Sequence, residues 1–335
     1  MHILPGFWHA AARLSGRVDW TVPLSDHAAP TLARLSLDRL VAAGIPPHRA
    51  LALLSEPALP DPGPWLSLAD LGWPGALHGL GHAPAVLFYR GDLRLLQEPA
   101  IAVVGTRRCT ETGRRLARTL ARATVDAGAV VVSGLAHGID SEAHAAVPGR
   151  TVAVLGQSLD LPLDRHQQRL ADTVVESGGL LISEFPPTTR PARWTFPQRN
   201  RVIAGLARAT VVIEAARRSG ALITARFANE YGREVLAVPG SPLQDASQGC
   251  LDLIADGARI CRGADDLLAA LGTTTPTRSE PDALLAKLVR PITLDELLDE
   301  TGQDPVTLLR RLGALELTGV IQRLPGDRYL RRTSP

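Results

Sequence analysis

The chain has 335 residues, 45% of them hydrophobic, which is enough for one large domain with smaller appendages. No apolar run reaches the length of a membrane span, residues 1–16 lack the pattern of a secretory signal, and three widely spaced cysteines fit neither a disulfide framework nor a zinc ribbon. We therefore expect a cytoplasmic protein without a membrane partner. The net charge of +2 is small, so the distribution of charge says more about partners than its total.

The first 90 residues show little regular pattern. Short helical patterns occur at residues 7–14, 32–43 and 49–54, and a proline-rich linker follows at residues 57–64. We predict a small helical module over residues 1–64.

From residue 101 onward, short apolar runs alternate with segments of helical pattern. Near-continuous apolarity is typical of strands that are buried on both faces of a parallel sheet, with helices as right-handed crossovers. The pattern predicts a doubly wound α/β domain with a parallel sheet. The predicted strands are residues 101–105, 129–133, 151–156, 180–184, 210–214, 234–239 and 259–262.

A polar linker at residues 272–280 separates this region from a different pattern. Thr293 and Glu296 have the spacing of a capping box, and Asp304 followed by Pro305 is typical of another helix start. The pattern predicts a winged helix over residues 281–335. Its predicted helices are residues 282–289, 293–301 and 304–317, and its predicted hairpin strands are residues 320–323 and 329–332.

The first predicted strand of the sheet ends in a glycine, Gly105, and Thr106 and Arg107 come directly after it. Such a glycine lets backbone N–H groups approach an anion, and the helix expected to begin near Glu111 adds its N-terminal dipole. The spacing matches neither a dinucleotide-binding loop nor a Walker A loop, so no nucleotide cofactor is predicted. Arg107 is placed to bind a phosphate, and a solvated loop arginine is the alternative.

The second predicted strand ends in a similar bend at residues 133–140. Small residues after two neighbouring strands form a groove at the carboxyl edge of the sheet, where open α/β domains bind ligands. His137, Asp140 and His144 could share one face of the next helix, an arrangement that would suit a metal site. The favoured alternatives are a core histidine at position 144 and an Asp140 that caps the helix or orients a neighbour, so no metal is predicted.

Residues 193–201 interleave arginines with two aromatic rings, Trp194 and Phe196. This is the chemistry of single-strand binding, because guanidinium groups contact the backbone and rings stack on bases. The alternative is that the rings pack into the core below the loop, and for Trp194 both interpretations stay open.

Glu214 ends the fifth predicted strand, and Ser219 and Gly220 open the next helix with N–H groups directed at the same groove. Glu214 is the only acid that we place near the groove. The sequence lacks a nucleophile elbow, a Cys–His pair and clustered carboxylates, so we do not predict an enzyme.

Positive charge gathers in the middle of the chain. Residues 190–233 hold nine arginines against two glutamates, residues 107–122 hold six against one, and residues 282–304 hold six acids against two bases. A basic cluster indicates a polyanion partner, and ordinary solvated faces are the alternative.

Together these residues resemble the DNA-processing protein A (DprA/Smf) family. The matches occur in order from about Trp65 to Ala270. They are Trp73-Pro74, Ala85–Gly91, Val104–Arg107, Ser133–Asp140, Ala143-His144, Leu181–Glu184, Phe196–Arg201, Glu214, Ser219–Ala225, Val238–Gly240 and Gly257-Ala258.

The resemblance implies an extended Rossmann-like fold at residues 65–271, after a degenerate, SAM-like helical module at residues 1–64. It also implies a homodimer that binds single-stranded DNA without strong sequence preference and hands it to the RecA recombinase during natural transformation. The dimer edge would fall around Leu251 and Ile260. The DNA site would comprise Gly105, Thr106, Arg107, Ser133, Gly134, His137, Gly138, Arg193, Phe196, Arg199, Asn200, Ser219 and Gly220.

Two residues depart from the family pattern. His137 stands where many relatives place a lysine, which would weaken one phosphate contact or make it pH-dependent. Trp73 replaces the usual tyrosine, a change that we regard as structural.

Two other functions compete with the DNA-binding hypothesis. A nucleoside-phosphate hydrolase would need a catalytic carboxylate, for which Glu214 is the only candidate. A transcription regulator would use the winged helix on duplex DNA. The acidic charge of residues 282–304 favours a partner-docking or regulatory role for the winged helix instead.

Overall fold

The structure is a computed structural model that describes residues 41, 46–48, 50–51, 63–68, 70–80, 83–272, 284, 287–288, 290–302, 304–317 and 321–331. The chain divides into two compact units, residues 1–273 and 274–335. Almost all of the predicted module at residues 1–64 and most of the predicted helix at residues 282–289 lie outside the described residues. Among the described residues, no helix combines the length and the apolarity needed to cross a membrane.

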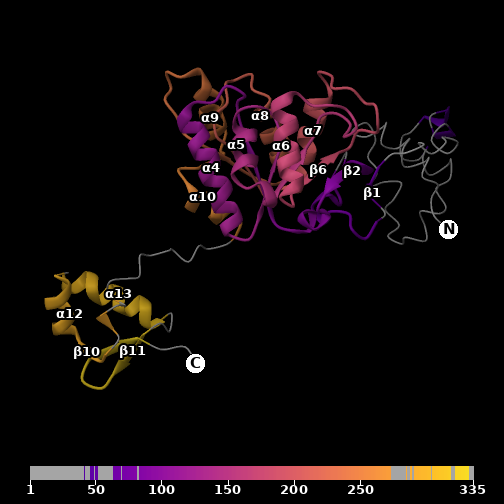
Figure 1. The fold of residues 1–335 in the computed structure, drawn as a ribbon. Helices are drawn as coiled ribbons and strands as arrows, with labels where there is room; N and C mark the ends of the chain where they lie inside the picture. The colour runs from indigo at the N-terminus through magenta and orange to yellow at the C-terminus, as the bar shows by residue number, and fades with distance from the viewer. Residues whose placement is uncertain are drawn as a thin grey trace. The chain divides into compact units, whose positions relative to one another are not determined.

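The larger unit is built on a nine-stranded sheet with the order β1-β2-β6-β5-β4-β3-β7-β8-β9 (Figure 1). Seven of its strands are parallel, and each lies within two residues of a strand predicted from an apolar run. The doubly wound parallel sheet is therefore confirmed. The strands are β3 (Ala100–Val104), β4 (Val130–Ser133), β5 (Thr151–Val154), β6 (Leu180–Ser183), β7 (Ala209–Val212), β8 (Glu234–Ala237) and β9 (Arg259–Ile260).

Two strands were not predicted. β1 (Trp65–Ser67) pairs with β2 (Val86–Gly91), and β2 pairs antiparallel with β6, so both extend the sheet beyond its parallel part. Both lie in the region whose pattern looked irregular, because the segments between them are turns and short 3-10 helices, η2 (Gly75–Leu77) and, after β2, η3 (Leu93–Gln97).

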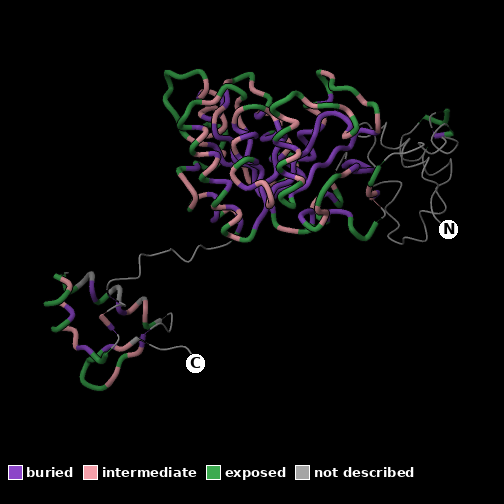
Figure 2. The backbone as a smooth tube through the Cα atoms, viewed as in Figure 1, coloured by how far each residue is buried: buried purple, intermediate pink, exposed green. Residues whose placement is uncertain are grey.

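Helices cover both faces of the sheet, because side chains of each strand alternate between them. Ile101 and Val103 of β3 pack with the helices of one face, and Ala102 and Val104 pack with those of the other. Figure 2 shows the resulting buried strands inside an exposed shell. The first face carries α4 (Glu111–Asp126), α5 (Ile139–Ala146), α6 (Arg165–Glu176) and α10 (Ala264–Ala270), and the second carries α7 (Thr195–Leu206), α8 (Ala221–Glu230) and α9 (Asp245–Ala255).

The strand order reverses beside β3. From β3 the chain proceeds outward through β4 and β5 to β6, and it then returns to β7 on the other side of β3. Connections leave such a point in opposite directions, which opens a crevice at the carboxyl ends of the strands. The bends predicted to bind phosphate follow β3 and β4, so the topology places them at this crevice.

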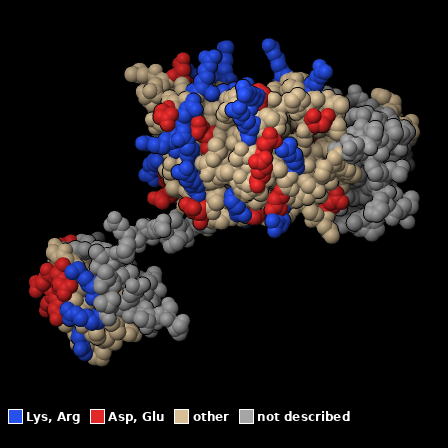
Figure 3. Space-filling view, in the orientation of Figure 1, with Lys and Arg blue, Asp and Glu red and all other residues tan. Residues whose placement is uncertain are grey.

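The smaller unit is a winged helix, as predicted. Thr293 and Glu296 form the predicted capping box, and Pro305 begins the next helix. The exposed acids of α12 form a red patch on this unit in Figure 3. Its elements are β10 (Ile292–Thr293), α12 (Leu294–Thr301), α13 (Pro305–Leu317), β11 (Ile321–Leu324) and β12 (Arg328–Arg331).

Candidate nucleic-acid interface

Two adjoining cavities, of about 330 and 440 Å³, lie at the carboxyl edge of the sheet. Both cavities are lined by Arg107, Ala136, Phe196 and Arg199, so these four residues form the boundary between them. We call the two cavities together the trough. The predicted residues that line it are Gly105, Thr106, Arg107, Gly134, His137, Phe196, Arg199, Asn200, Ser219 and Gly220.

Arg107 and Phe196 form the centre of the trough. The guanidinium carbon of Arg107 lies 5.7 Å from the centroid of the Phe196 ring. The ring is 36% exposed and packs on Gly156, where an added Cβ would come within 2.7 Å of it. No side-chain hydrogen bond or ion pair holds Arg107 within the described part of the chain. An exposed cation therefore lies over an exposed ring, and both remain available to a ligand.

The bends after β3 and β4 touch because both contain glycine. Gly138 has a positive φ of 82°, and an added Cβ would lie 2.3 Å from the carbonyl oxygen of Thr106. At Gly105 an added Cβ would lie 2.6 Å from Cγ1 of Ile139, whose N–H group donates to the Thr106 carbonyl at 3.3 Å. The close approach of the bends thus requires glycine at both positions.

Arg199 lies beneath both cavities and is only 5% exposed. Its Nη1 donates to the carbonyl oxygen of Val154 at 2.9 Å, and its guanidinium occupies the space that a side chain at Gly134 would need. Its Nε has no hydrogen-bond partner among the described residues. Burial lowers the pKa of Arg199 to about 10, with Asp140 opposing the decrease and Arg107 adding to it. Arg199 therefore remains a cation at neutral pH.

Asp140 is the buried counter-charge of Arg199. Its Oδ2 accepts the N–H group of Gly134 at 3.1 Å. Burial raises the pKa of Asp140, and the attraction of Arg199 works against that increase. Because cation and carboxylate both contact Gly134, a single buried cluster supports the bend after β4.

His144 is a core histidine, as the favoured interpretation held. Its Nε2 accepts the N–H group of Leu135 at 3.3 Å, and its Nδ1 lies 2.7 Å from the hydroxyl of Thr151. Burial lowers the pKa of His144 to about 3, so the ring is neutral. His137 does not share its helix face, because α5 begins only at Ile139. Among the described residues, no group of three potential ligands could hold a metal ion.

His137 lies at one end of the trough. Its Nε2 is 2.9 Å from Oδ2 of Asp164, and its ring centroid is 5.2 Å from that of His166. Asp164 in turn accepts the N–H groups of His166 and Gln167 and so caps α6. His137 is half exposed, so it can contact a ligand in the trough.

Three predicted residues, Ser133, Gly138 and Arg193, do not line the trough. Ser133 is fully buried and donates its hydroxyl to the Val103 carbonyl at 2.6 Å. Asn200 lines the trough and donates to the Gly220 carbonyl at 3.1 Å, which ties α7 to the loop before α8. Arg193 is exposed and lines neither cavity. The trough therefore brings together most, but not all, of the predicted residues.

Trp194 is exposed rather than buried. It is 51% exposed and stands edge-on to Phe185, with ring centroids 5.8 Å apart. Of the two interpretations left open by the sequence, packing into the core is thus wrong.

Some residues of the trough gave no signal in the sequence. Gln157 and Gln167 bring side-chain amides to the first cavity, and Pro162 and Pro191 bring apolar surface. These residue types are common in any loop, so spacing alone does not single them out. Arg218, which lines the second cavity beside Ser219, could have been found from the basic surplus of residues 190–233.

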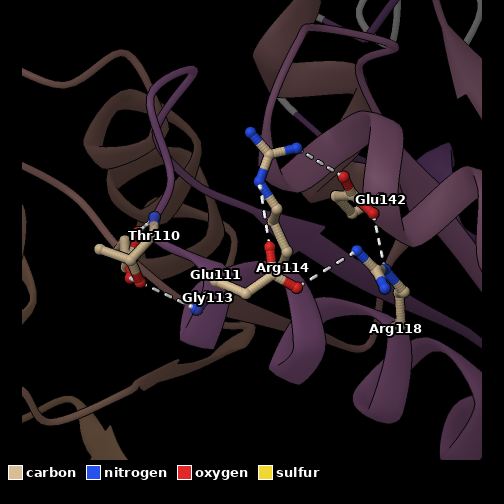
Figure 4. Close-up of polar contacts among 7 residues, drawn as sticks. Thr110, Glu111, Gly113, Arg114, Arg118 and Glu142 are labelled. Carbon is tan, nitrogen blue, oxygen red and sulfur yellow. Dashed lines mark hydrogen bonds and ion pairs between the residues drawn. The ribbon is translucent and has the colours of Figure 1, made fainter.

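Glu214 has a structural role outside the trough. Its carboxylate accepts the N–H group of Thr110 at 2.9 Å and the Thr110 hydroxyl at 2.5 Å. The same hydroxyl accepts the N–H group of Gly113 at 3.0 Å and caps α4, as Figure 4 shows. Glu214 lines neither cavity and holds the start of α4 instead.

The distribution of charge on the surface agrees with an anion-binding role for the trough. Figure 3 shows arginine side chains that protrude along the upper edge of the larger unit, above α7 and α8. More of them cover its left side, over α4, where acidic side chains are interleaved. The surface near the trough therefore attracts anions.

Comparison with known proteins agrees with the fold and the order of the motifs. Residues 65–272 match the family model described as DNA recombination-mediator protein A, and residues 269–327 match the DprA winged helix domain. Protein Smf from Synechocystis is 35% identical in an alignment that covers 80% of each chain. DNA processing protein DprA from Streptococcus pneumoniae is 42% identical over 209 residues, 62% of this chain and 73% of that relative.

Two solved structures are similar as well. The X-ray structure of DprA from Streptococcus pneumoniae covers 80% of this chain and 98% of its own, with a TM-score of 0.68 and 33% identity. DNA processing protein A from Helicobacter pylori, whose structure is described as revealing its single-stranded DNA binding mode, covers 62% of this chain and 96% of its own, with a TM-score of 0.56 and 29% identity. The chain therefore belongs to the DNA recombination-mediator protein A (DprA/Smf) family.

Proposed function

We propose that this protein binds single-stranded DNA largely independently of sequence and mediates the loading of RecA recombinase in natural transformation. The proposal rests chiefly on the trough, in which Arg107 lies over Phe196 and buried Arg199 lies below. Cations bind the phosphates of a flexible strand, and a ring stacks on bases of any sequence. A relative with this fold, the Helicobacter pylori protein, binds single-stranded DNA, which supports the same ligand here.

Within this proposal the predicted residues have distinct roles. Arg107, with Gly105 and Thr106, binds one phosphate at the bend after β3. Phe196 provides the stacking surface, and Arg199 adds positive potential from below. Arg193, which lies outside the trough, contacts the backbone of a strand that extends beyond it.

We further propose a homodimer that forms at the β9 edge of the sheet. β9 pairs only with β8 among the described strands, and its Ile260 is 44% exposed. Leu251, on the neighbouring α9, is half-buried. An exposed apolar side chain on an edge strand is a ready surface for a second copy.

The remaining parts of the proposal concern organisation and location. The functional core is residues 65–271, with a helical module before it and, beyond the linker at residues 272–280, a winged helix at residues 281–335. The exposed acids of α12 favour protein docking over duplex binding for the winged helix. We place the protein in the cytoplasm, where RecA acts on incoming DNA.

A hydrolytic function has less support. The acid that the sequence offered, Glu214, is engaged by Thr110 and lines neither cavity. The acids that do line the trough have other roles, because Asp140 is buried beside Arg199 and Asp164 caps α6. We propose instead that the protein is not an enzyme.

Replacing Phe196 by alanine tests the stacking role. Stacking of one base on an aromatic side chain contributes about 1–3 kcal/mol, so we expect roughly tenfold weaker binding of a labelled oligothymidine of about 20 nucleotides. Anisotropy titrations measure the affinity, and a duplex of the same length should bind more weakly than the single strand. Phe196→Trp should retain the affinity because it keeps a ring.

An abasic oligonucleotide of the same length serves as the matched ligand. It has the phosphates but no bases, so Phe196→Ala should leave its affinity unchanged. Equal losses on both ligands would assign Phe196 a structural role, and equal binding of duplex and single strand would refute the proposed function.

A further inference from the structure

A third cavity, of about 450 Å³, continues from the trough onto the helix layer. It shares Arg107 with both cavities of the trough and His137 with the first of them. We call it the helix-layer groove. It is lined by Arg107, Arg114, His137, Gly138, Ser141, Glu142, Ala145, His166, Arg169, Leu170 and Thr173.

The groove has a floor of small residues. Gly138, Ser141 and Ala145 recur at helical spacing where α5 begins and along it, so no long side chain rises between the walls. His166 and Thr173, seven residues apart on α6, mark a wall about 10 Å long. The floor and the wall together form a channel that an extended single strand of DNA can follow.

Cations outnumber acids along this channel. Arg169 is exposed, and within the described ranges its side chain makes no hydrogen bond or ion pair. The one acid of the lining, Glu142, is paired with two arginines, at 2.8 Å from Nη1 of Arg114 and 2.7 Å from Nε of Arg118 (Figure 4). Glu111 also lies within 3.9 Å of both arginines and is largely exposed.

Asp164, the acid where the trough meets the groove, also has hydrogen-bond partners within the protein. Asp164 accepts from His137 and caps α6, so its carboxylate is occupied at the junction of trough and groove. Arg107 and Arg169 remain as cations without an acidic partner in the described structure. Two such cations in the lining of one short channel are suited to successive phosphates of one chain.

We propose that the helix-layer groove carries the continuation of the bound strand and that Arg169 binds a second phosphate there. This inference rests on the proposed function and adds a path and a residue to it. Apart from its two histidines, the described lining holds no aromatic ring, so the groove recognises the sugar-phosphate backbone and not the bases. The strand thus leaves the trough past Arg107 and His137 and crosses α5 toward α6.

Oligothymidines of two lengths distinguish binding in the trough from binding in the helix-layer groove. A short oligothymidine of about 4 nucleotides fills the trough alone, whereas one of about 20 nucleotides also reaches the groove. We expect Arg169→Ala to weaken binding of the long strand by about threefold to tenfold and of the short strand by less than about twofold, and to reduce the salt slope for the long strand by about 0.7. Arg169→Lys, which keeps the charge, should restore most of the loss.

Arg122→Ala is the matched control, because Arg122 is also an exposed arginine and lies near the far end of α4. It should bind both strands as the unmodified protein does. If Arg169→Ala binds the long strand normally while Arg107→Ala does not, the groove proposal is wrong and the trough stands. If the unmodified protein binds neither strand, the proposed function itself fails. Equal losses on short and long strands would place Arg169 in the trough and would overturn the groove.

Discussion

Replacing Arg107 by alanine should weaken binding of single-stranded DNA by about tenfold to a hundredfold, since hydrogen bonds to charged groups contribute about 1.5–3 kcal/mol. Arg107 is the residue common to all three cavities, and its cation lies over the ring of Phe196. No described acid neutralises it, so an approaching phosphate does not have to displace an internal partner. Anisotropy titration with a labelled oligothymidine measures the change.

The salt dependence of binding shows whether the lost interaction is with a phosphate. Each phosphate neutralised on a single strand contributes about 0.7 to the slope of log affinity against log salt, so Arg107→Ala should reduce the slope by about that amount. Arg122→Ala should leave both affinity and slope unchanged. Affinity equal to that of the unmodified protein would remove Arg107 from the site. A loss of affinity with an unchanged slope would mean that Arg107 does not contact a phosphate.

Replacing Arg199 by methionine should lower the free energy of unfolding by about 3 kcal/mol, because it removes a buried cation and leaves the buried carboxyl group of Asp140 without its compensating charge. Met fills a similar volume, so the main change is the loss of the cation that lies near Asp140. Asp140 would remain buried with its hydrogen bond from Gly134 but without the attraction that favours its charged form. Urea denaturation measures the loss.

The loss should depend on pH in a defined direction. Burial raises the pKa of Asp140 in the folded protein, and removal of Arg199 raises it further. A carboxyl group whose pKa is higher in the folded state binds more protons there than in the unfolded state, so stability falls as pH rises through that window. The defect of Arg199→Met should therefore be smaller at about pH 5 than at about pH 8.

A second variant isolates the role of Asp140. Asp140→Asn in the Arg199→Met background removes the uncompensated charge, so it should recover part of the lost stability and abolish the added pH dependence. A loss that is constant across the pH range, or an Asp140→Asn change that destabilises the variant further, would show that the two groups are not coupled.

The parallel part of the fold could be predicted because strands buried on both faces of a sheet are apolar at nearly every position. Runs such as Ile101–Gly105 are apolar at every position, and the capping box at Thr293 marks a helix start through local chemistry alone. β1 and β2 were missed for the opposite reason. They pair antiparallel at the side of the sheet, and β2 loses its burial along its length, so neither carries the full signal.

The candidate site could be predicted in outline. Glycines at Gly105 and Gly138 mark bends that must approach closely, and the segment around Phe196 combines rings and cations. The direction of a side chain after a strand end does not follow from spacing, so the burial of Ser133 and the position of Arg193 outside the trough could not be foreseen. The same holds for the groove, which exists only because α5 and α6 pack side by side.

A crystal structure of the full chain with an oligothymidine of about 12 nucleotides tests the central claim most directly. We expect the strand to lie along the carboxyl edge of the sheet, with a phosphate on Arg107, a base on Phe196 and the chain continuing toward Arg169. A strand bound instead to the winged helix or to another face, with the trough empty, would contradict the account.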